Sequence, residues 1–390
     1  MAMKKMELSL GGEKEEISFP PLSPVSAALT TFSLSLSILP VFKFNKVLIN
    51  EASLIELLRN EIMPFNDRLS SIVHTDKKGV KRWRKVDFSV EDLLVIPTFP
   101  SGLSPEECDQ HLHKYLSKIG TERFPMDRPL WEVHVITYPT TSGGGAVVFK
   151  FCHAIGDGYS LVSLLMKVLR RADDPSLPLS FPNITLRSKI VRKNNGFSFA
   201  LKCFNTVSDV VAMVGRSMWL KDHKTATVND VITGIIHYAI HLYMFKKEED
   251  FGGERMTSLT MLNLRSLRGF NNVDEMVKAG IWGNSSITLC MPIPTFVPKE
   301  HIDRDPLEFI ERAKESMKRI RDSALVQIIM PVIKKLNHMK GAEAVAEFIS
   351  STMKNNTTLI TNVIGPNEKM AMAGYPVGDF FYFVTGIPQA

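Results

Sequence analysis

The stretch of sequence that decides the fold covers residues 146–158 and reads AVVFKFCHAIGDG. Its first part is an apolar run that ends on His153, which predicts a buried β-strand. The following AIGDG predicts a tight turn, because Gly156 and Gly158 allow backbone angles that other residues resist. Residues 159–171 carry apolar side chains at helical spacing and predict a helix. We therefore expect an imidazole at the end of a strand, where a cleft can open.

This arrangement suits acyl transfer from a thioester to an alcohol. The attacking hydroxyl must lose its proton, and imidazole is a suitable base because its pKa lies close to working pH. Asp157, four residues after His153, can hold the turn by pairing with an arginine. Arg265 is our first choice of partner, and Arg128 and Arg268 are the alternatives. On its own, an HxxxDG run is a weak signal, and an isolated histidine on an apolar strand is more often a core residue.

The same periodicities predict the elements around this stretch. Helices are expected at 54–62 with Ser53 as N-cap, at 105–119 with Ser104 as N-cap, and at 228–245, 306–322 and 342–353. Strands are expected at 32–38, 69–73, 82–86, 131–138, 258–263, 286–291 and 358–363. The strand at 131–138 should form a hairpin with the one at 146–152 through the glycine-rich turn between them. Strands and helices mix without strict alternation, which predicts an α+β or mixed α/β fold.

Composition narrows the class of partner. The 390 residues include 47 Lys and Arg against 41 Asp and Glu, which gives a net charge of +6. A pI near 9.0 suits an anionic partner, such as a membrane surface or a phosphate-bearing molecule. We expect no nucleic acid, because the basic residues are scattered and no zinc-finger or RNA-binding motif occurs. We also expect no metal: His237 and His241 have metal-pair spacing, but no third ligand accompanies them.

No targeting or membrane-spanning segment is expected in the N-terminal region. Residues 1–19 lack the apolar core of a signal peptide. Residues 17–42 are uncharged, but early prolines interrupt them and the later part alternates like a strand. The semi-apolar residues 197–220 fit an interfacial helix or a helix packed on the core about equally well. Four widely spaced cysteines favour reduced thiols in a cytosol-facing protein.

Several segments together resemble one family. CHAIGDG at 152–158 resembles the HHxxxDG signature of the wax-ester synthase/diacylglycerol acyltransferases. These enzymes belong to the condensation-domain superfamily, with chloramphenicol acetyltransferase and the plant BAHD enzymes. Further blocks follow in family order, namely RPLWEVHVI from Arg128, TVNDVITGI from Thr227, NLRSLRG from Asn263, GN at Gly283 and TNVIGP from Thr361. The resemblance implies a mixed α/β, two-lobed chloramphenicol acetyltransferase-like fold around a channel.

The resemblance also implies roles for matching residues. His153 is then the general base, and Asp157 is a structural carboxylate. Asn229, Asn284 and Asn362 become candidates for the substrate channel, although the first two also suit a helix cap and a turn. The expected reaction moves a fatty acyl group from acyl-CoA, as co-substrate and without a further cofactor, to a long-chain alcohol or diacylglycerol. The expected location is the cytosolic side of the endoplasmic reticulum membrane, with the plasma membrane as an alternative, and the oligomeric state is left open.

Two departures from the family pattern shape the predicted organisation. Cys152 replaces the first motif histidine, and strand alternation predicts that it points away from His153 into packing. The stretch 220–227 is short for the family. We expect a flexible terminus at 1–19, a lobe at 20–172, a linker at 173–196 and a second lobe at 197–390 that is truncated. The alternatives are an impaired family member that binds acyl-CoA or a partner without turnover, and a BAHD-like transferase acting on a soluble alcohol.

Overall fold

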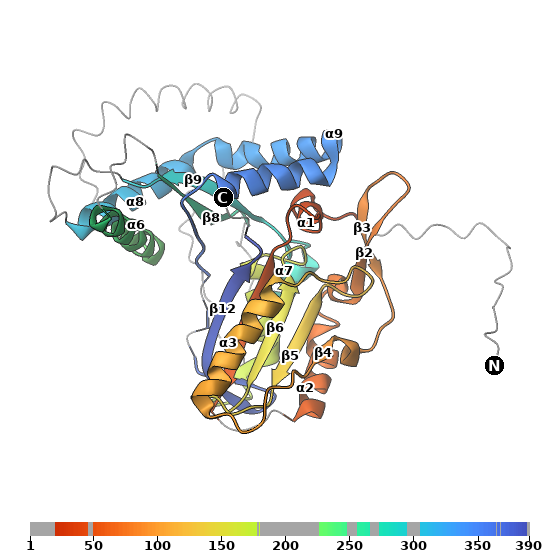
Figure 1. The fold of residues 1–390 in the computed structure, drawn as a ribbon. Helices are drawn as coiled ribbons and strands as arrows, with labels where there is room; N and C mark the ends of the chain where they lie inside the picture. Colours follow the sequence, from red (N-terminus) through yellow and green to blue (C-terminus); the bar gives the residue numbers. More distant parts are fainter. Residues whose placement is uncertain are drawn as a thin grey trace, which may run out of the picture.

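The computed structural model describes residues 20–45, 50–177, 179, 226–247, 256–265, 273–294, 305–363, 365–366 and 368–387. Within these residues the chain forms two layered parts (Figure 1). One is built on a large sheet, and the other combines a small sheet with long helices. The fold is mixed α/β, as the sequence predicts.

The large sheet has seven strands in the order β4-β5-β6-β1-β12-β11-β7. β5 (Trp131–Ile136) and β6 (Ala146–Cys152) pair antiparallel, so the predicted hairpin is confirmed. β1 (Ser37–Phe44) lies antiparallel to both β6 and β12 (Tyr375–Thr385). The remaining strands are short: β4 (Leu94–Val95), β7 (Leu169–Arg171) and β11 (Met370–Met372).

Helices cover both faces of this sheet, which is why β5, β6 and β1 are buried along their whole length. Helix α3 (Pro105–Thr121) packs Leu112 and Leu116 with Val148 of β6 and neighbours on β1. On the other face, Val147 and Phe149 join a larger core with α2 (Glu51–Leu57), the π-helical turn Leu58–Ile62 and α4 (Gly158–Val168). Successive residues of β6 therefore serve two different cores.

The second part contains a three-stranded sheet in the order β10-β8-β9. Its strands are β8 (Thr257–Asn263), β9 (Ser286–Pro292) and β10 (Thr358–Ile360), flanked by α6 (Val228–Lys246), α7 (Val273–Lys278), α8 (Pro306–Asp322) and α9 (Leu325–Lys354). Gly234 lets α6 approach α8 closely, since a Cβ there would lie 2.6 Å from the Ile310 Cα. Helix α9 is kinked at Gly341, whose φ of 82° interrupts the helix. The other described elements are helix α1 (Pro24–Ala28), the hairpin of β2 (Ser71–Thr75) and β3 (Lys81–Lys85), and two 3-10 helices at Asp67–Ser70 and Val90–Leu93.

Several predicted boundaries were wrong. The strand expected at 32–38 begins only at Ser37, where its pairing with β6 and β12 begins. Pro24 starts the short helix Pro24–Ala28 instead of preventing a helix. The N-cap of α2 is Asn50, whose side chain accepts from the Ala52 amide, and not Ser53. The strand predicted at 146–152, in contrast, has these bounds, and His153 follows it directly. Helix α4 ends at Val168, because the next three residues pair with β11.

The division of the chain at 173–196 does not describe the large sheet. β11 and β12 follow the whole second part in sequence, yet they lie between β1 and β7 in the sheet of the first part. The proposed second lobe at 197–390 is therefore interrupted, and its last strands belong to the other sheet. The terminus at 1–19, residues 197–220 and most of the linker lie outside the described residues.

Candidate active site

His153 lies in the turn directly after β6. Its amide donates to the Leu36 carbonyl at 2.8 Å, and the Ile155 amide closes the turn by donating to the Cys152 carbonyl at 3.0 Å. The turn is therefore attached to the residues that lead into β1. These bonds hold the turn at the end of β6, next to the segment that precedes β9.

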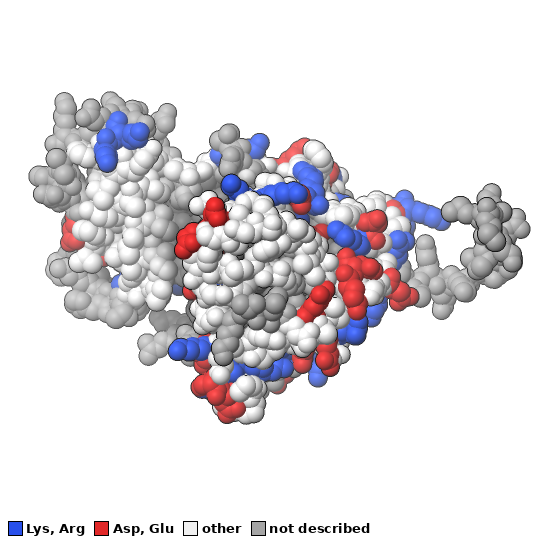
Figure 2. Space-filling model, turned by 60° about the horizontal axis from the view of Figure 1, so that its bottom comes forward, with Lys and Arg blue, Asp and Glu red and all other residues white. Residues whose placement is uncertain are grey.

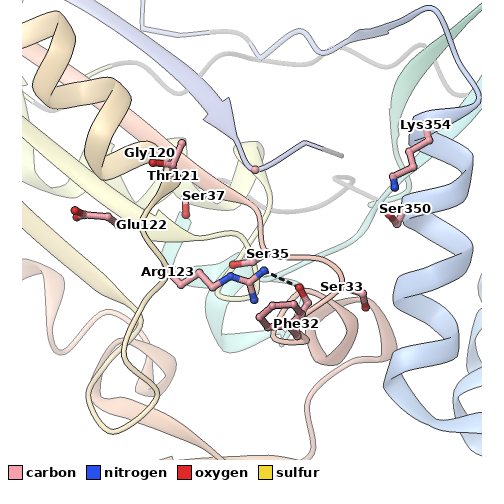
Figure 3. Close-up of a pocket in the computed structure, with 11 residues that line it drawn as sticks. Phe32, Ser33, Ser35, Ser37, Gly120, Thr121, Glu122, Arg123, Ser350 and Lys354 are labelled. Carbon is pink, nitrogen blue, oxygen red and sulfur yellow. Dashed lines mark hydrogen bonds between the residues drawn. The ribbon is translucent and has the colours of Figure 1, made fainter. Parts of the chain in front are cut away.

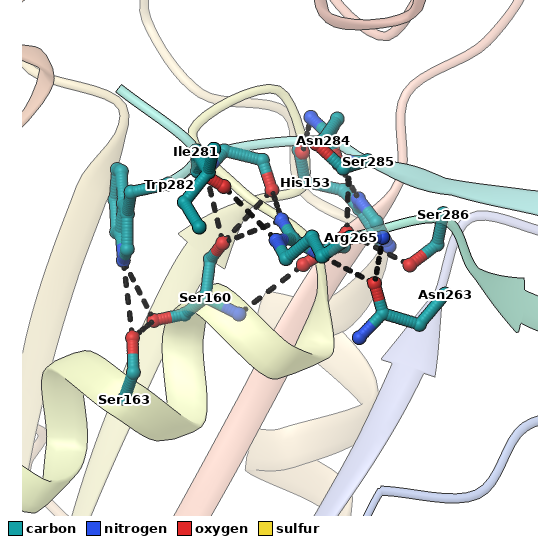
Figure 4. Close-up of polar contacts among 12 residues, drawn as sticks. His153, Ser160, Ser163, Asn263, Arg265, Ile281, Trp282, Asn284, Ser285 and Ser286 are labelled. Carbon is teal, nitrogen blue, oxygen red and sulfur yellow. Dashed lines mark hydrogen bonds and ion pairs between the residues drawn. The ribbon is translucent and has the colours of Figure 1, made fainter. Parts of the chain in front are cut away.

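Asn284 contacts the imidazole from that segment (Figure 4). Its Oδ1 lies 3.2 Å from His153 Nδ1. Its Nδ2 lies within donating distance of the His153 carbonyl at 2.8 Å, the Ala154 carbonyl at 3.3 Å and Ser26 Oγ at 3.1 Å. Carbonyls only accept, so they fix the orientation of the amide and leave Oδ1 as the acceptor. Nδ1 of His153 then carries the proton, and the lone pair is on Nε2.

Burial keeps the imidazole neutral. Desolvation lowers the pKa of His153 below its ordinary value, and the nearby Asp157 carboxylate opposes this only in part. A neutral imidazole with a free Nε2 is the form that accepts a proton from an alcohol.

Asp157 is a structural anion at the N-terminus of α4. Its Oδ1 accepts from the Ser160 amide at 3.1 Å and caps the helix. Its Oδ2 accepts from Arg265 Nη1 at 2.7 Å, from the Ser285 amide at 3.0 Å and from Ser286 Oγ at 2.8 Å. Burial raises the pKa of Asp157, but Arg265 and these hydrogen bonds outweigh burial, and the net pKa is lowered. The carboxylate is thus ionised and fully engaged.

Arg265 is the arginine that pairs with Asp157. The two side chains are almost completely buried. Arg265 also donates to the Ile281 carbonyl at 3.0 Å, to Ser160 Oγ at 2.9 Å and to the Gly283 carbonyl. Of the alternatives, Arg128 pairs with Glu132, and Arg268 lies outside the described residues. The loop at 153–157, called the histidine loop below, follows β6 of the large sheet. The Asp157–Arg265 pair joins this loop to the strands of the small sheet.

Sequence reasoning missed three residues that complete this network. Ser160 Oγ accepts from the Gly283 amide at 2.9 Å, and Trp282 Nε1 donates to the Ser160 carbonyl at 2.9 Å. Arg68 Nη1 donates to the Ile155 carbonyl at 2.9 Å, and its guanidinium lies 5.7 Å from the ring centre of Trp282. Only Ser160 carried a signal, because it sits three residues after Asp157 at a helix start.

The motif glycines serve close packing. Gly156 and Gly158 are absent from the glycines with positive φ, so the expectation of unusual backbone angles was wrong. A Cβ on Gly156 would lie 2.9 Å from the Ser160 Cβ, and one on Gly158 would lie 2.8 Å from Val363 Cγ2. Gly283 does have a positive φ, of 130°. Small residues are needed here because the loop, α4 and the Gly283 segment meet without free space.

Cys152 is buried in the core below the loop, with its Sγ 3.9 Å from the Leu29 carbonyl. Burial raises the pKa of this thiol to about 11, so it remains protonated. A buried, protonated thiol is a packing residue and not a nucleophile.

The structure does not bring the other two asparagines to His153. Asn229 lies in the first turn of α6, with its Nδ2 4.0 Å from Met317 Sδ on α8. Asn362 is exposed, one residue before Val363, which packs on Gly158. The helix start around Asn229 is capped by Thr227 and Asp230 in a reciprocal capping box.

A polar pocket of about 280 Å³ lies beside the residues that carry the histidine loop (Figure 3). Ser37 pairs with Cys152, and Ser35 and Ser37 flank the residue whose carbonyl binds His153. Arg123 lines the pocket, stacks on Phe32 and donates to its carbonyl at 2.7 Å. Lys354 faces the pocket from the end of α9. The pocket thus combines serine hydroxyls with two cationic side chains and one carboxylate, that of Glu122.

Comparison with known proteins gives a consistent result. Models of one family match twice: the wax ester synthase/diacylglycerol acyltransferase catalytic domain over residues 102–246, and the WS/DGAT C-terminal domain over residues 282–390. Wax ester synthase/diacylglycerol acyltransferase 3 of Arabidopsis thaliana is 27% identical, with coverage of 100% of this chain and 88% of the relative. Wax ester synthase/diacylglycerol acyltransferase 1 of the same plant is 26% identical, and the alignment covers 96% of this chain and 86% of that relative.

A solved structure shows the same fold. The wax ester synthase/diacylglycerol acyltransferase from Marinobacter aquaeolei VT8 aligns with a TM-score of 0.52 at 14% identity, over 93% of this chain and 86% of that one. The ordered sequence blocks, both family models and this shared architecture agree. The chain therefore belongs to the wax ester synthase/diacylglycerol acyltransferase family.

Proposed function

We propose that this acyltransferase moves a fatty acyl group from acyl-CoA to the hydroxyl of a long-chain alcohol or diacylglycerol, with His153 as general base. The observation that carries the proposal is the hydrogen bonding of the imidazole. Asn284 binds Nδ1, so the lone pair lies on Nε2, and burial keeps the ring neutral. The family supplies the reaction class.

The chemistry then follows from the two ring nitrogens. Nε2 takes the hydroxyl proton as the alcohol oxygen attacks the thioester carbonyl. The imidazolium is stabilised because Asn284 Oδ1 accepts from Nδ1. When the tetrahedral intermediate collapses, the carbon–sulfur bond breaks, and the imidazolium returns its proton to the leaving CoA sulfur. His153 ends neutral, and the products are an ester and free CoA.

The remaining loop residues position this base. Asp157 has its oxygens committed to Arg265, two serines and the helix N-terminus, which leaves it no role in proton transfer. We assign the anionic part of CoA to the polar pocket. Arg123 and Lys354 offer positive charge there, and serine hydroxyls offer further donors.

The test is single-turnover esterification of palmitoyl-CoA with hexadecanol or diacylglycerol, alongside equilibrium binding of a non-hydrolysable acyl-CoA. His153→Ala should reduce turnover by about two to four orders of magnitude and leave binding largely intact, because a base acts mainly in the transition state. His113→Ala, an exposed histidine of α3, is the matched control. Turnover at the wild-type rate in His153→Ala would refute the assigned base. Acyl-CoA binding without esterification by the wild-type chain would refute the proposed reaction.

We further propose that the protein binds the cytosolic surface of the endoplasmic reticulum membrane. Helix α6 supports this, because its polar side faces inward and its apolar side faces outward. Its buried residues include Asp230, Thr233 and His237. Its exposed stripe follows helical spacing and consists of Val228, Ile232, Ile235, Leu242 and Tyr243. Charged residues are sparse on the side of the molecule where α6 lies (Figure 2). A helix of this kind can lie at a lipid surface.

Among the residues that the structure describes, no helix is long and apolar enough to cross a membrane. Attachment through the surface of α6 is peripheral in this proposal, so carbonate washing of microsomes should release much of the protein. In flotation with phosphatidylcholine and phosphatidylserine vesicles, Ile232→Glu with Ile235→Glu should reduce binding. Ile96→Glu, at an exposed residue elsewhere, should leave it unchanged. Equal flotation of the two variants would exclude α6 as the contact.

A further inference from the structure

We infer that an apolar groove along α4 holds the alkyl chain of a substrate, and this inference rests on the proposed acyl transfer. The groove has a volume of about 450 Å³, which is within the usual range of small-molecule pockets. One wall is the face of α4 and β7 formed by Val162, Leu165, Met166 and Leu169. The other is formed by Phe380, Phe381 and Tyr382 of β12 and by the segment that starts at Val363.

The groove begins beside the histidine loop. Val363, which lines it, packs on Gly158, and Gly158 follows Asp157 directly. From there the wall runs along one face of the helix, because positions 162, 165, 166 and 169 follow helical spacing. At 1.5 Å per residue, Val162 and Leu169 are about 10 Å apart along the axis. A chain that lies in the groove therefore extends away from the region of His153.

The lining matches an alkyl chain in chemistry. Of the described residues that line the groove, none carries a charge. The hydroxyl of Tyr382 is engaged with the Val363 backbone, and burial raises the pKa of this phenol. Leu165 and Leu169 are buried, whereas Val162, Met166 and Phe381 remain partly exposed along the opening. Apolar side chains that border an open groove are typical of a ligand site.

Two substrates share this chemistry, the acyl chain of acyl-CoA and the chain of a fatty alcohol. Met166→Trp fills the groove from a partly exposed position, so the fold should tolerate it. Met126→Trp, at a methionine that is 44% exposed elsewhere, is the matched control. Each protein is assayed with acyl-CoAs of eight to eighteen carbons against a fixed alcohol, and with alcohols of the same lengths against palmitoyl-CoA. Circular dichroism confirms that both variants are folded.

The expected result is a loss of preference for long chains in Met166→Trp. The kcat/KM for eight-carbon substrates should change little, whereas each excluded methylene should cost about fourfold, the equivalent of one buried CH₂. A change confined to the acyl-CoA series assigns the groove to the acyl chain, and a change confined to the alcohol series assigns it to the acceptor. Unchanged profiles in both series would overturn the inference.

Binding separates this inference from the proposed reaction. Calorimetric titration with octanoyl-CoA and palmitoyl-CoA requires no turnover. Suppose that wild-type protein forms no ester but binds palmitoyl-CoA more tightly than octanoyl-CoA, and that Met166→Trp removes this difference in affinity. The groove would then be supported and the proposed reaction refuted. If wild-type protein forms no ester, and Met166→Trp binds both palmitoyl-CoA and hexadecanol as the wild-type protein does, the results contradict both the groove and the reaction.

Discussion

Asn284 is the residue on which the state of the base depends. Its amide accepts from Nδ1 of His153 and donates to the loop carbonyls, so it sets the imidazole tautomer and its position together. The sequence suggested Asn284 only as a channel candidate or a turn residue, because nothing local shows that the segment 282–286 meets a loop about 130 positions earlier.

Changing Asn284 should move the acid limb of the pH–rate profile in a direction set by the replacement. The wild-type rate should fall below a midpoint lower than 6.5, because the folded pKa of His153 is lowered and only the neutral ring is a base. Asn284→Asp places a carboxylate beside the ring and should raise the midpoint. Asn284→Leu removes a bond that favours the charged ring, so it should lower the midpoint and reduce kcat/KM by about tenfold. The measurement is kcat/KM from pH 5 to 8, and a midpoint that is the same in all three proteins would contradict this role.

Asp157→Asn should reduce stability as well as rate. It leaves the buried Arg265 without its counterion, and breaking a buried ion pair by changing one partner typically costs about 3–5 kcal/mol. Since the folded pKa of Asp157 is lowered, the stabilisation is present above the unfolded pKa and is lost as pH falls through the folded pKa. Urea denaturation at pH 7 measures the loss. Asp67→Asn, from the exposed pair with Lys85, should cost about 0–1 kcal/mol. A fully stable Asp157→Asn with a reduced rate would assign the carboxylate to the chemistry instead.

At the level of elements, helix α6 buries its polar side and exposes its apolar side, which is the reverse of the usual amphipathic helix. His237 is buried on its inner side, with Nε2 2.8 Å from Ser258 Oγ on β8. Burial lowers the pKa of His237 to about 4. The sequence favoured packing over metal binding for this histidine, but it gave no sign that the apolar face of the helix would be exposed.

His237 should make the protein less stable as the pH falls. Its pKa is about 4 when folded and 6.5 when unfolded, so between these values the unfolded chain binds more protons. Above pH 6.5 this residue does not reduce the free energy of unfolding. Between pH 6.5 and about 4 it lowers the free energy of unfolding by up to about 3 kcal/mol. His237→Gln keeps a donor for Ser258 and should flatten the slope of unfolding free energy against pH. His74→Gln, on an exposed strand position, should leave the slope unchanged. Equal slopes in wild type and His237→Gln would show that the group is not buried as neutral imidazole.

Sequence periodicity predicted the helices well where a whole amphipathic face and a cap are local. Helix α8 has the predicted bounds, and Ser104 is the N-cap of α3 as predicted, whereas the N-cap of α6 is Thr227 and not Asn229. Boundaries set by tertiary contacts were missed: α4 ends early because Leu169 pairs with β11, and β1 begins at Ser37 because its pairing with β6 and β12 begins there. In the site, the motif indicated His153, Asp157 and the two glycines. Arg68 and Trp282 were not predicted, because their roles depend on contacts between distant segments.

For the whole molecule, the position of β12 is the feature that joins the two ends of the chain. β12 pairs with β1 along its length, from Ser37 opposite Thr385 to Phe44 opposite Val377, and this pairing lies in the middle of the large sheet. Residues more than 300 positions apart must therefore meet before the sheet is complete. No single-sequence pattern specifies such a pairing, because alternation identifies a strand and not its neighbour.

This topology predicts that the large sheet unfolds as one unit with the C-terminal strand. Phe383 lies opposite Leu39 and packs on the core beneath α3. Phe383→Ala should cost about 2 kcal/mol, less than a fully buried phenylalanine because the side chain is only half-buried. Hydrogen exchange should show the loss of protection in amides of β1 and β6 as well as β12, since breaking a central strand exposes both neighbours. Phe348→Ala, at an exposed phenylalanine of α9, should change none of these amides. Loss confined to β11 and β12, with β1 and β6 unchanged, would mean that the C-terminal strands form a separate unit. The histidine loop follows β6 and is hydrogen-bonded to Leu36, just before β1. In that case the stability of this loop would not depend on β12.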